Sequence, residues 1–147
     1  MKRTATYRSD MLNFRYDASL HVRHPSTFPD VITTELCRKA SRSHCKGESK
    51  RTPTNARLDG TYPENFWTCD LETEDQVDIT DFLKNVVMTF LPHRPFLKQL
   101  NTTGGEVCIF IGIFGDGCCS HQFDNQLLTD LADTGFDLRL DFYGSEA

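Results

Sequence analysis

The chain has 147 residues, 38% of them hydrophobic, and its 11 Phe, 4 Tyr and single Trp add apolar area for a core. One domain of this length buries about two-thirds of the surface of its unfolded chain. No stretch approaches the roughly 18 apolar residues of a membrane span, and the basic N-terminus lacks the apolar run of a signal peptide. We therefore expect a cytoplasmic protein without membrane contact, whose six cysteines are reduced thiols.

Charge is divided unevenly between the two halves of the chain. Residues 1–69 hold 12 Lys and Arg against 7 Asp and Glu, a balance of +5, whereas residues 70–147 hold 4 against 14, a balance of −10. An acidic half without a compensating basic run argues against nucleic acid as the partner. It is compatible with a basic protein partner, although a solvated acidic surface produces the same balance.

The predicted elements of the first half follow a polar N-terminal arm, residues 1–13. Apolar and polar residues alternate from Phe14 to Arg23, which predicts a half-buried strand. A short helix is expected from Asp30 to about Arg38. A short strand near Ala40–Cys45 then precedes a long loop over residues 46–65, and a loop of that length in a compact domain is usually functional or mobile. Residues 66–71 resume the sheet.

The second half begins with the most regular helix, for which Asp78 is the expected cap. Its apolar stripe follows the spacing i, i+3, i+4, i+7, i+8, i+11 and i+12. The stripe consists of Ile79, Phe82, Leu83, Val86, Val87, Phe90 and Leu91. Pro92 ends this helix, and Pro95 suits the first turn of a short one that turns Phe96, Leu97 and Leu100 inward.

The last third of the chain predicts a strand, a helix and a strand. The strand is the apolar run 106–114, and the helix covers residues 124–133 and ends at Gly135. In the closing strand the apolar residues alternate with polar ones. These apolar residues are Phe136, Leu138, Leu140 and Phe142.

The order of elements predicts one α+β domain over residues 14–144. It matches the ferredoxin-like split βαβ plan, a two-layer sandwich with a mainly antiparallel sheet and helices on one face. The additional C-terminal helix and strand are expected to add a fifth, parallel strand at one edge of the sheet.

Such a plan leaves one sheet face without helices, which we expect to be a docking surface or a dimer seam. Alternation assigns to this face Arg15, Asp17, Ser19, His21, Asp137, Arg139 and Asp141. The strand 106–114 contributes either Cys108, Phe110 and Phe114, or Val107, Ile109, Ile111 and Ile113. The alternative is that the N-terminal arm or the long loop covers this face.

From Asp30 onward the order of short motifs resembles a bacterial family, domain of unknown function 4279, and we place the similarity at about residues 14–143. The resembling segments are Asp30–Cys37, the basic stretch Ser41–Glu48 ending in Lys-Gly-acidic, Phe66–Thr68, the acidic helix start Asp75–Asp81, and Phe123–Tyr143. The resemblance implies the same fold and brings no established activity. It implies a small bacterial protein for which an immunity-type binding role is one interpretation.

The turn around Cys118 is the most metal-like local cluster and is not a feature of the family. Its residues Cys118, Cys119 and His121, together with His44 and Cys45, are weak candidates for zinc ligands. Adjacent cysteines chelate poorly, and no second motif with paired ligand spacing exists. We therefore predict a turn that contains cysteines, with no metal, no cofactor and no catalytic residue.

Two groups of residues are predicted to bind a ligand or a protein. Lys46, Gly47 and Glu48 combine an unusual backbone turn with opposite charges, and Trp67 is the only indole of the chain. The alternative for this group is a turn at a strand end with Trp67 in the core. His21 and Arg23 share one strand face and could hold an anion, although exposed residues at a strand end produce the same pattern.

No catalytic constellation emerges from the sequence. The leading hypothesis is therefore a non-catalytic binding protein with a protein partner, of the immunity type that neutralises that partner. A second hypothesis is a small metal- or ligand-binding enzyme that uses the His and Cys candidates. A third is a structural homo-oligomer, such as a homodimer, that pairs through the open sheet face.

Overall fold

The computed structural model describes residues 14–144, so the predicted arm at residues 1–13 lies outside the described residues. The strands are β1 (Arg15–His24), β2 (Arg42–His44), β3 (Ser49–Arg51), β4 (Arg57–Thr61), β5 (Asn65–Leu71), β6 (Glu106–Phe114) and β7 (Asp137–Tyr143). The helices are α2 (Pro29–Leu36), α3 (Ile79–Phe90), the 3-10 turn η1 (Leu91–His93), α4 (Arg94–Thr102) and α5 (Asn125–Thr134).

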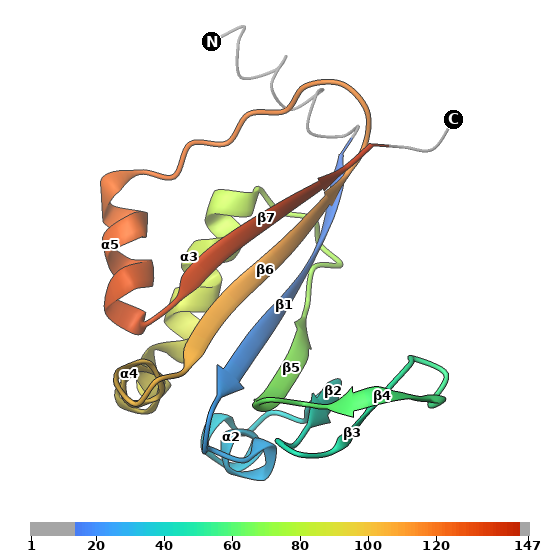
Figure 1. Cartoon of the computed structure of the whole chain (residues 1–147). Helices are drawn as coiled ribbons and strands as arrows, with labels where there is room; N and C mark the ends of the chain where they lie inside the picture. Colours follow the sequence, from blue (N-terminus) through green and yellow to red (C-terminus); the bar gives the residue numbers. More distant parts are fainter. Residues whose placement is uncertain (1–13, 145–147) are drawn as a thin grey trace, which may run out of the picture.

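Five strands form the main sheet in the order β2-β5-β1-β6-β7 (Figure 1). The pairs β2–β5, β5–β1 and β1–β6 are antiparallel, whereas β6 and β7 are parallel. The mixed α+β fold with a mainly antiparallel sheet is therefore confirmed, and β7 is the predicted fifth, parallel strand at one edge. The strand order is that of the split βαβ plan, because β5 lies between β1 and β2.

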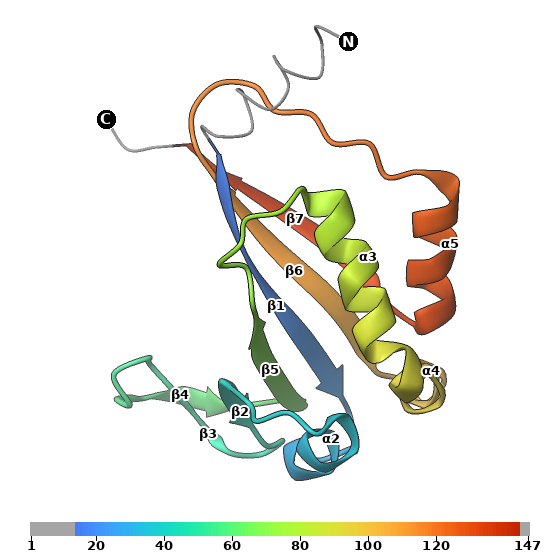
Figure 2. The same ribbon diagram turned by 180° about the vertical axis from the view of Figure 1, so that it is seen from behind.

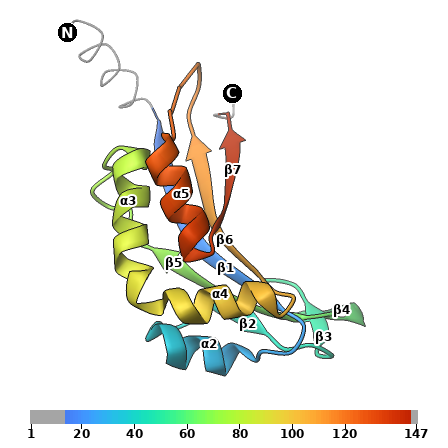
Figure 3. The ribbon, with the colours of Figure 1, turned by 90° about the vertical axis from the view of Figure 1, so that its left-hand side faces the viewer.

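All the described helices lie on one side of the sheet, as the views from behind and from the side show (Figures 2 and 3). They cover a core in which α3 contributes the predicted stripe, with Ile79, Phe82, Leu83, Val86, Val87 and Phe90 buried. Leu91 is the exception, because Pro92 converts the chain to a 3-10 turn there and Leu91 is exposed. Pro92 thus ends the helix as predicted but also rotates the last residue of the stripe away from the core.

The boundaries of α5 follow from its two caps. Asp124 precedes the helix, and its Oδ1 accepts a hydrogen bond from the Leu127 N–H at 2.8 Å. Gly135 ends the helix in a left-handed conformation with φ 92°, as the sequence predicts. Leu127, Leu131 and Phe136 then reach the core, whereas Phe142 at the end of β7 remains exposed although it alternates with polar residues as predicted.

The segment predicted as a long loop, residues 46–65, contains a β-hairpin instead. Its strands β3 and β4 form a separate two-stranded sheet (Figure 1). No residue from Ser49 to Thr61 is buried, so the hairpin adds no side chain to the core. Backbone bonds extend the pairing to its base, where the Gly47 N–H donates to Tyr62 O and the Tyr62 N–H donates to Glu48 O, both at 2.9 Å.

Gln76 continues the sheet where β5 has ended. Its side-chain Oε1 accepts the Tyr16 N–H at 3.0 Å, and its Nε2 donates to Tyr16 O at 2.9 Å. The amide therefore pairs with both backbone groups of one β1 residue, as a neighbouring strand would. The Tyr16 hydroxyl donates to Val77 O at 2.5 Å, and burial, followed by the charges of Asp78 and Asp81, raises its pKa to about 12.

Candidate functional site on the open sheet face

The face of the sheet opposite the helices, here called the open face, has no described helix over it (Figure 1). The alternating burial along β6 shows which of its residues lie on the open face. Val107, Ile109, Ile111 and Ile113 are buried toward the helices, which leaves Cys108, Phe110 and Phe114 on the open face. The register then aligns His21 with Cys108 and Thr68, and Arg139 with Phe110, so the predicted polar residues share this face.

A row of aromatic rings crosses four strands of the open face. His44 of β2 stacks on Phe66 of β5 with ring centroids 5.3 Å apart, and Phe66 meets His21 of β1 edge-on at 5.6 Å. His21 in turn stacks on Phe110 of β6 at 5.2 Å. A separate stacked pair, Phe114 and Tyr143 at 5.0 Å, lies at the far end of β6 and β7. Cross-strand aromatic pairs of this kind stabilise a sheet. Within the row Phe66 is only 3% exposed, whereas His21, His44 and Phe110 remain partly exposed.

Four arginines lie over these rings. The Cζ atoms of Arg23 and Arg42 are 4.7 and 5.5 Å from the Phe66 centroid. Arg139 lies over Phe110 at 5.3 Å, and Arg15 lies over Phe114 at 5.0 Å. Each contact has the geometry of a cation–π interaction. Burial, followed by the charges of Arg23, Arg42 and Arg139, lowers the pKa of His21, so this row carries a neutral imidazole between guanidinium groups.

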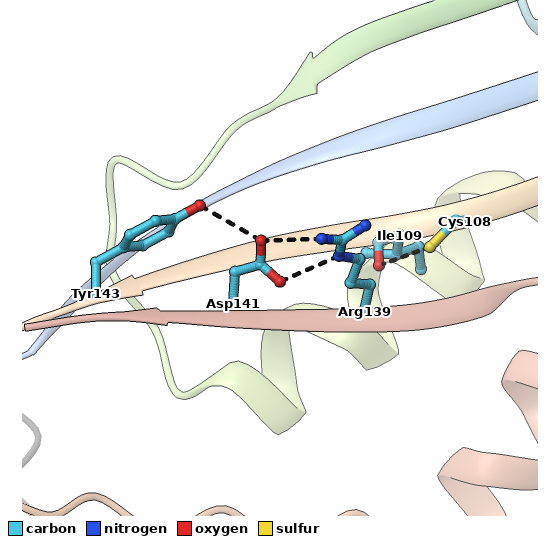
Figure 4. A network of polar contacts seen from close by, with 5 residues as sticks. All are labelled: Cys108, Ile109, Arg139, Asp141 and Tyr143. Carbon is cyan, nitrogen blue, oxygen red and sulfur yellow. Dashed lines mark hydrogen bonds and ion pairs between the residues drawn. The ribbon is translucent and has the colours of Figure 1, made fainter.

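Acidic residues neutralise three of these arginines. Arg15 lies 3.9 Å from Asp17, and Arg23 lies 3.7 Å from Glu64. On β7, Arg139 donates from Nε and Nη2 to the two oxygens of Asp141 at 3.1 and 3.4 Å, and the Tyr143 hydroxyl donates to the same carboxylate (Figure 4). Arg42, by contrast, forms no ion pair with any residue between 14 and 144.

A concave pocket of about 430 Å³ lies between the hairpin and the β2 end of the open face; we call it the hairpin pocket. Its charged and aromatic lining includes Arg23, Arg42, Arg51, His44, Glu48 and Phe66. Three guanidinium groups against one carboxylate give it a positive lining, in a chain whose net charge is −5. Guanidinium is the cation that best matches the paired oxygens of carboxylate and phosphate.

The imidazole of His44 forms one wall of the hairpin pocket. Its ring stacks on Tyr62, with centroids 3.4 Å apart, and its buried Nδ1 has no hydrogen-bond partner among the described residues. Burial is the main cause that lowers the pKa of His44; Glu48 opposes this effect, and Arg23 and Arg42 reinforce it. The ring is therefore neutral at pH 7, and the positive lining is that of the arginines alone.

The residues predicted around the long loop do not form one site. Gly47 has the predicted left-handed backbone, with φ 88°, and Glu48 lines the hairpin pocket beside Arg23. The Lys46 N–H donates to Asn65 Oδ1 at 2.8 Å. Trp67, however, is fully buried on the helix side of β5, where its Nε1 donates to Thr33 Oγ1 at 2.9 Å. The structure therefore places Trp67 in the core, behind the sheet from His21 and Arg23.

The candidate metal ligands lie at two separate ends of the molecule. His44 ends β2 and Cys45 follows it near the hairpin, whereas Cys118, Cys119 and His121 belong to the connection between β6 and α5 (Figure 1). Within residues 14–144 no three His, Cys, Asp or Glu side chains come together as a metal site. His121 is instead nearest Asp78, with Nδ1 3.9 Å from Oδ1, and burial lowers its pKa.

Four of the cysteines, Cys45, Cys69, Cys108 and Cys119, lack the surroundings that activate a thiolate. None forms a disulfide in the structure. Burial raises the pKa of the Cys45, Cys69, Cys108 and Cys119 thiols, and Glu48 raises that of Cys45 further. A nucleophilic cysteine requires the opposite shift.

Sequence reasoning missed three residues of the hairpin pocket. Arg51 and Tyr62 lie in the segment predicted as a loop, and Arg42 lies in the short strand predicted near Ala40–Cys45, whose polar sequence assigned it to no face. Phe66 was predicted in a strand, but only the register with Arg23 and His44 shows that its ring faces the open side. The spacing of Arg42 and His44 at alternate positions of a predicted strand is the local signal that could have placed both on one face.

Comparison with known proteins identifies the family of the chain but no activity. No curated protein and no solved structure matches the chain. No helix within residues 14–144 is long and apolar enough to cross a bilayer. A family model described as "Domain of unknown function (DUF4279)" matches residues 14–145, nearly the whole chain. The chain therefore belongs to the DUF4279 family, as its order of motifs indicated.

Proposed function

We propose that the protein is a non-catalytic binding module that engages a protein partner through the open face. The observation that carries this proposal is the row of aromatic rings with arginines over them, on a sheet face that no described helix covers. Aromatic residues and Arg dominate the binding energy of protein interfaces, because they bury a large area at a low entropic cost.

The hairpin pocket gives one end of the proposed interface a positive charge. Arg42 has no acidic partner among residues 14–144, and its Cζ lies 5.5 Å from the ring that Arg23 also contacts. Glu64 already pairs with Arg23, so Arg42 is the guanidinium on this ring to which an incoming carboxylate would add a charge-assisted hydrogen bond. The proposed partner therefore presents an acidic side chain to the hairpin pocket and apolar groups to the aromatic row.

A role in neutralising its partner is the finer form of this proposal. It is supported by the absence of thiolate activation at four of the cysteines, by the absence of a metal cluster among the described residues, and by the immunity-type role that the family resemblance suggests. Such a protein would act by occupying a surface of its partner stoichiometrically. The aromatic row is then the part that blocks the partner.

The test is affinity capture from native extract with charge-reversed variants. The double variant Arg23→Glu and Arg42→Glu should lose a stoichiometric partner that the unmodified protein retains. A matched control, Lys84→Glu and Arg94→Glu, makes the same charge change on exposed residues of α3 and α4 and should retain the partner. Capture of no stoichiometric protein by the unmodified chain, or equal capture by the open-face variant, would reject this proposal.

A further inference from the structure

The outer edge of β7 is the longest unpaired strand edge in the described sheet. β7 has seven residues and lies at the end of the strand order, whereas the opposite edge strand, β2, has three (Figure 3). Unpaired edges are usually shortened, covered, or interrupted by Pro or Lys, because they otherwise add a strand from another chain. β7 contains neither Pro nor Lys.

The side chains of β7 leave apolar surface at this edge. Phe142 is 62% exposed, which is unusual for an aromatic residue in a strand, and Leu138 and Leu140 on the same side are only partly buried. On the open face the strand reads Asp137, Arg139, Asp141. The strand thus carries an apolar side and a side of alternating charge, both of which continue to its outer edge.

We propose that two copies of the chain pair antiparallel through β7, about a two-fold axis at Leu140. In this register Arg139 lies opposite the partner's Asp141, and Asp141 lies opposite the partner's Arg139. On the helix side Leu138 lies opposite the partner's Phe142, and Leu140 meets its own copy. Phe142 is then covered by the partner's Leu138, Arg139 and Asp141 each meet an opposite charge, and Asp137 lies opposite the partner's Tyr143.

The charge pattern selects this register over its neighbours. A two-fold axis at Arg139 places Arg139 against its own copy and Asp137 against the partner's Asp141. An axis at Asp141 places two aspartates against each other. Like charges directly opposite on a sheet are destabilising. Only the axis at Leu140 aligns all seven residues of β7, so it also forms the most backbone bonds.

The exchange of ion pairs on dimer formation costs little. In the single chain Arg139 pairs with Asp141 of its own strand, and its side chain is 65% exposed (Figure 4). Exposed pairs of this kind add little stability, so exchanging the two within-strand pairs of two chains for two cross-strand pairs is not opposed. The two-fold axis leaves both helix layers on one side and joins the two open faces into one continuous surface.

Charge exchange between two variants tests this proposal. Arg139→Asp places Asp against Asp in the homodimer, and Asp141→Arg places Arg against Arg, so each variant alone should dimerise at least about tenfold more weakly. Mixed together, the two variants restore both opposite-charge contacts and should form a heterodimer. Native mass spectrometry resolves the homodimers and the heterodimer by mass at micromolar concentration.

The control is Asp133→Arg, which makes the same change on an exposed residue of α5 and should dimerise like the unmodified protein. An unmodified protein that remains monomeric at high micromolar concentration would overturn the proposal. So would single variants that dimerise normally, or a mixture without heterodimer. The proposal does not depend on the binding function, because the edge of β7 and the hairpin pocket beside β2 lie at opposite edges of the sheet.

Discussion

His24 is an example of a histidine that is buried for a structural reason. It is 1% exposed, and its Nδ1 accepts the N–H groups of Ser26 and Thr27 at 3.0 and 2.8 Å. Because Nδ1 accepts, the neutral ring carries its proton on Nε2, which lies 2.7 Å from Thr103 Oγ1. One imidazole thus fixes the turn that leads into α2 and ties it to the end of α4.

The histidines predict a loss of stability in weak acid. Burial lowers the pKa of His21, His24, His44 and His121 below the ordinary value of 6.5. The unfolded chain therefore binds protons more readily than the folded one, so the stabilisation is present above about pH 6.5 and is lost as pH falls below it. Guanidinium unfolding should give a lower free energy at about pH 5.5 than at about pH 7.5. Equal free energies at the two pH values would contradict this.

Two glycines should respond differently to the same substitution. A Cβ at Gly105 would lie 2.6 Å from His24 Cδ2 and 2.8 Å from both Arg23 O and Leu100 O. Gly105→Ala should therefore cost about 2–4 kcal/mol, because backbone atoms must move. Gly47 has a left-handed φ but no atom within 4 Å of the added carbon, so Gly47→Ala should cost only about 1 kcal/mol. Thermal unfolding of the two variants compares them, and equal losses would be evidence against this account.

The β3–β4 hairpin is the element that sequence patterns could not predict. Leu58 is the only apolar residue in its two strands, so neither strand shows apolar alternation. Strands β1, β5, β6 and β7, by contrast, carry an apolar residue at every second position, and their predicted positions are confirmed. The face of β5 was also hard to predict, because Asn65 through Cys69 are all buried and Asp70 is the one exposed residue of the strand.

Replacement of the hairpin should separate binding from stability. Glu48 and Tyr62 are already hydrogen-bonded to each other, so an Asn-Gly turn can join them in place of residues 49–61. Because the removed residues bury no side chain, the free energy of unfolding should change by less than about 1 kcal/mol. Partner capture should fall, since the hairpin pocket loses Arg51 and one wall. A large loss of stability would show instead that the hairpin supports the core.

At the scale of the molecule, the fold assigns the two charged halves of the sequence to different places. The basic half forms β1, β2, the hairpin and β5, whereas the acidic half forms α3, α4, β6, α5 and β7. The composition therefore predicted an acidic surface, but only the strand order shows that arginines from both halves meet on one face. The β1–β6 pairings that bring them there join residues 83 to 99 positions apart, from Arg23↔Glu106 to Arg15↔Phe114, and local patterns do not encode these.

The place of β1 at the centre of the sheet has a consequence for the order of folding. β1 is the first strand made, yet its partners β5 and β6 begin about 50 and 90 residues later in the chain. Neither side of its backbone can be paired until those segments exist, so the sheet closes late. Folding dominated by such distant pairings is slow, in about milliseconds to seconds. A nascent chain therefore carries β1 as an unpaired apolar strand until most of the domain has been synthesised.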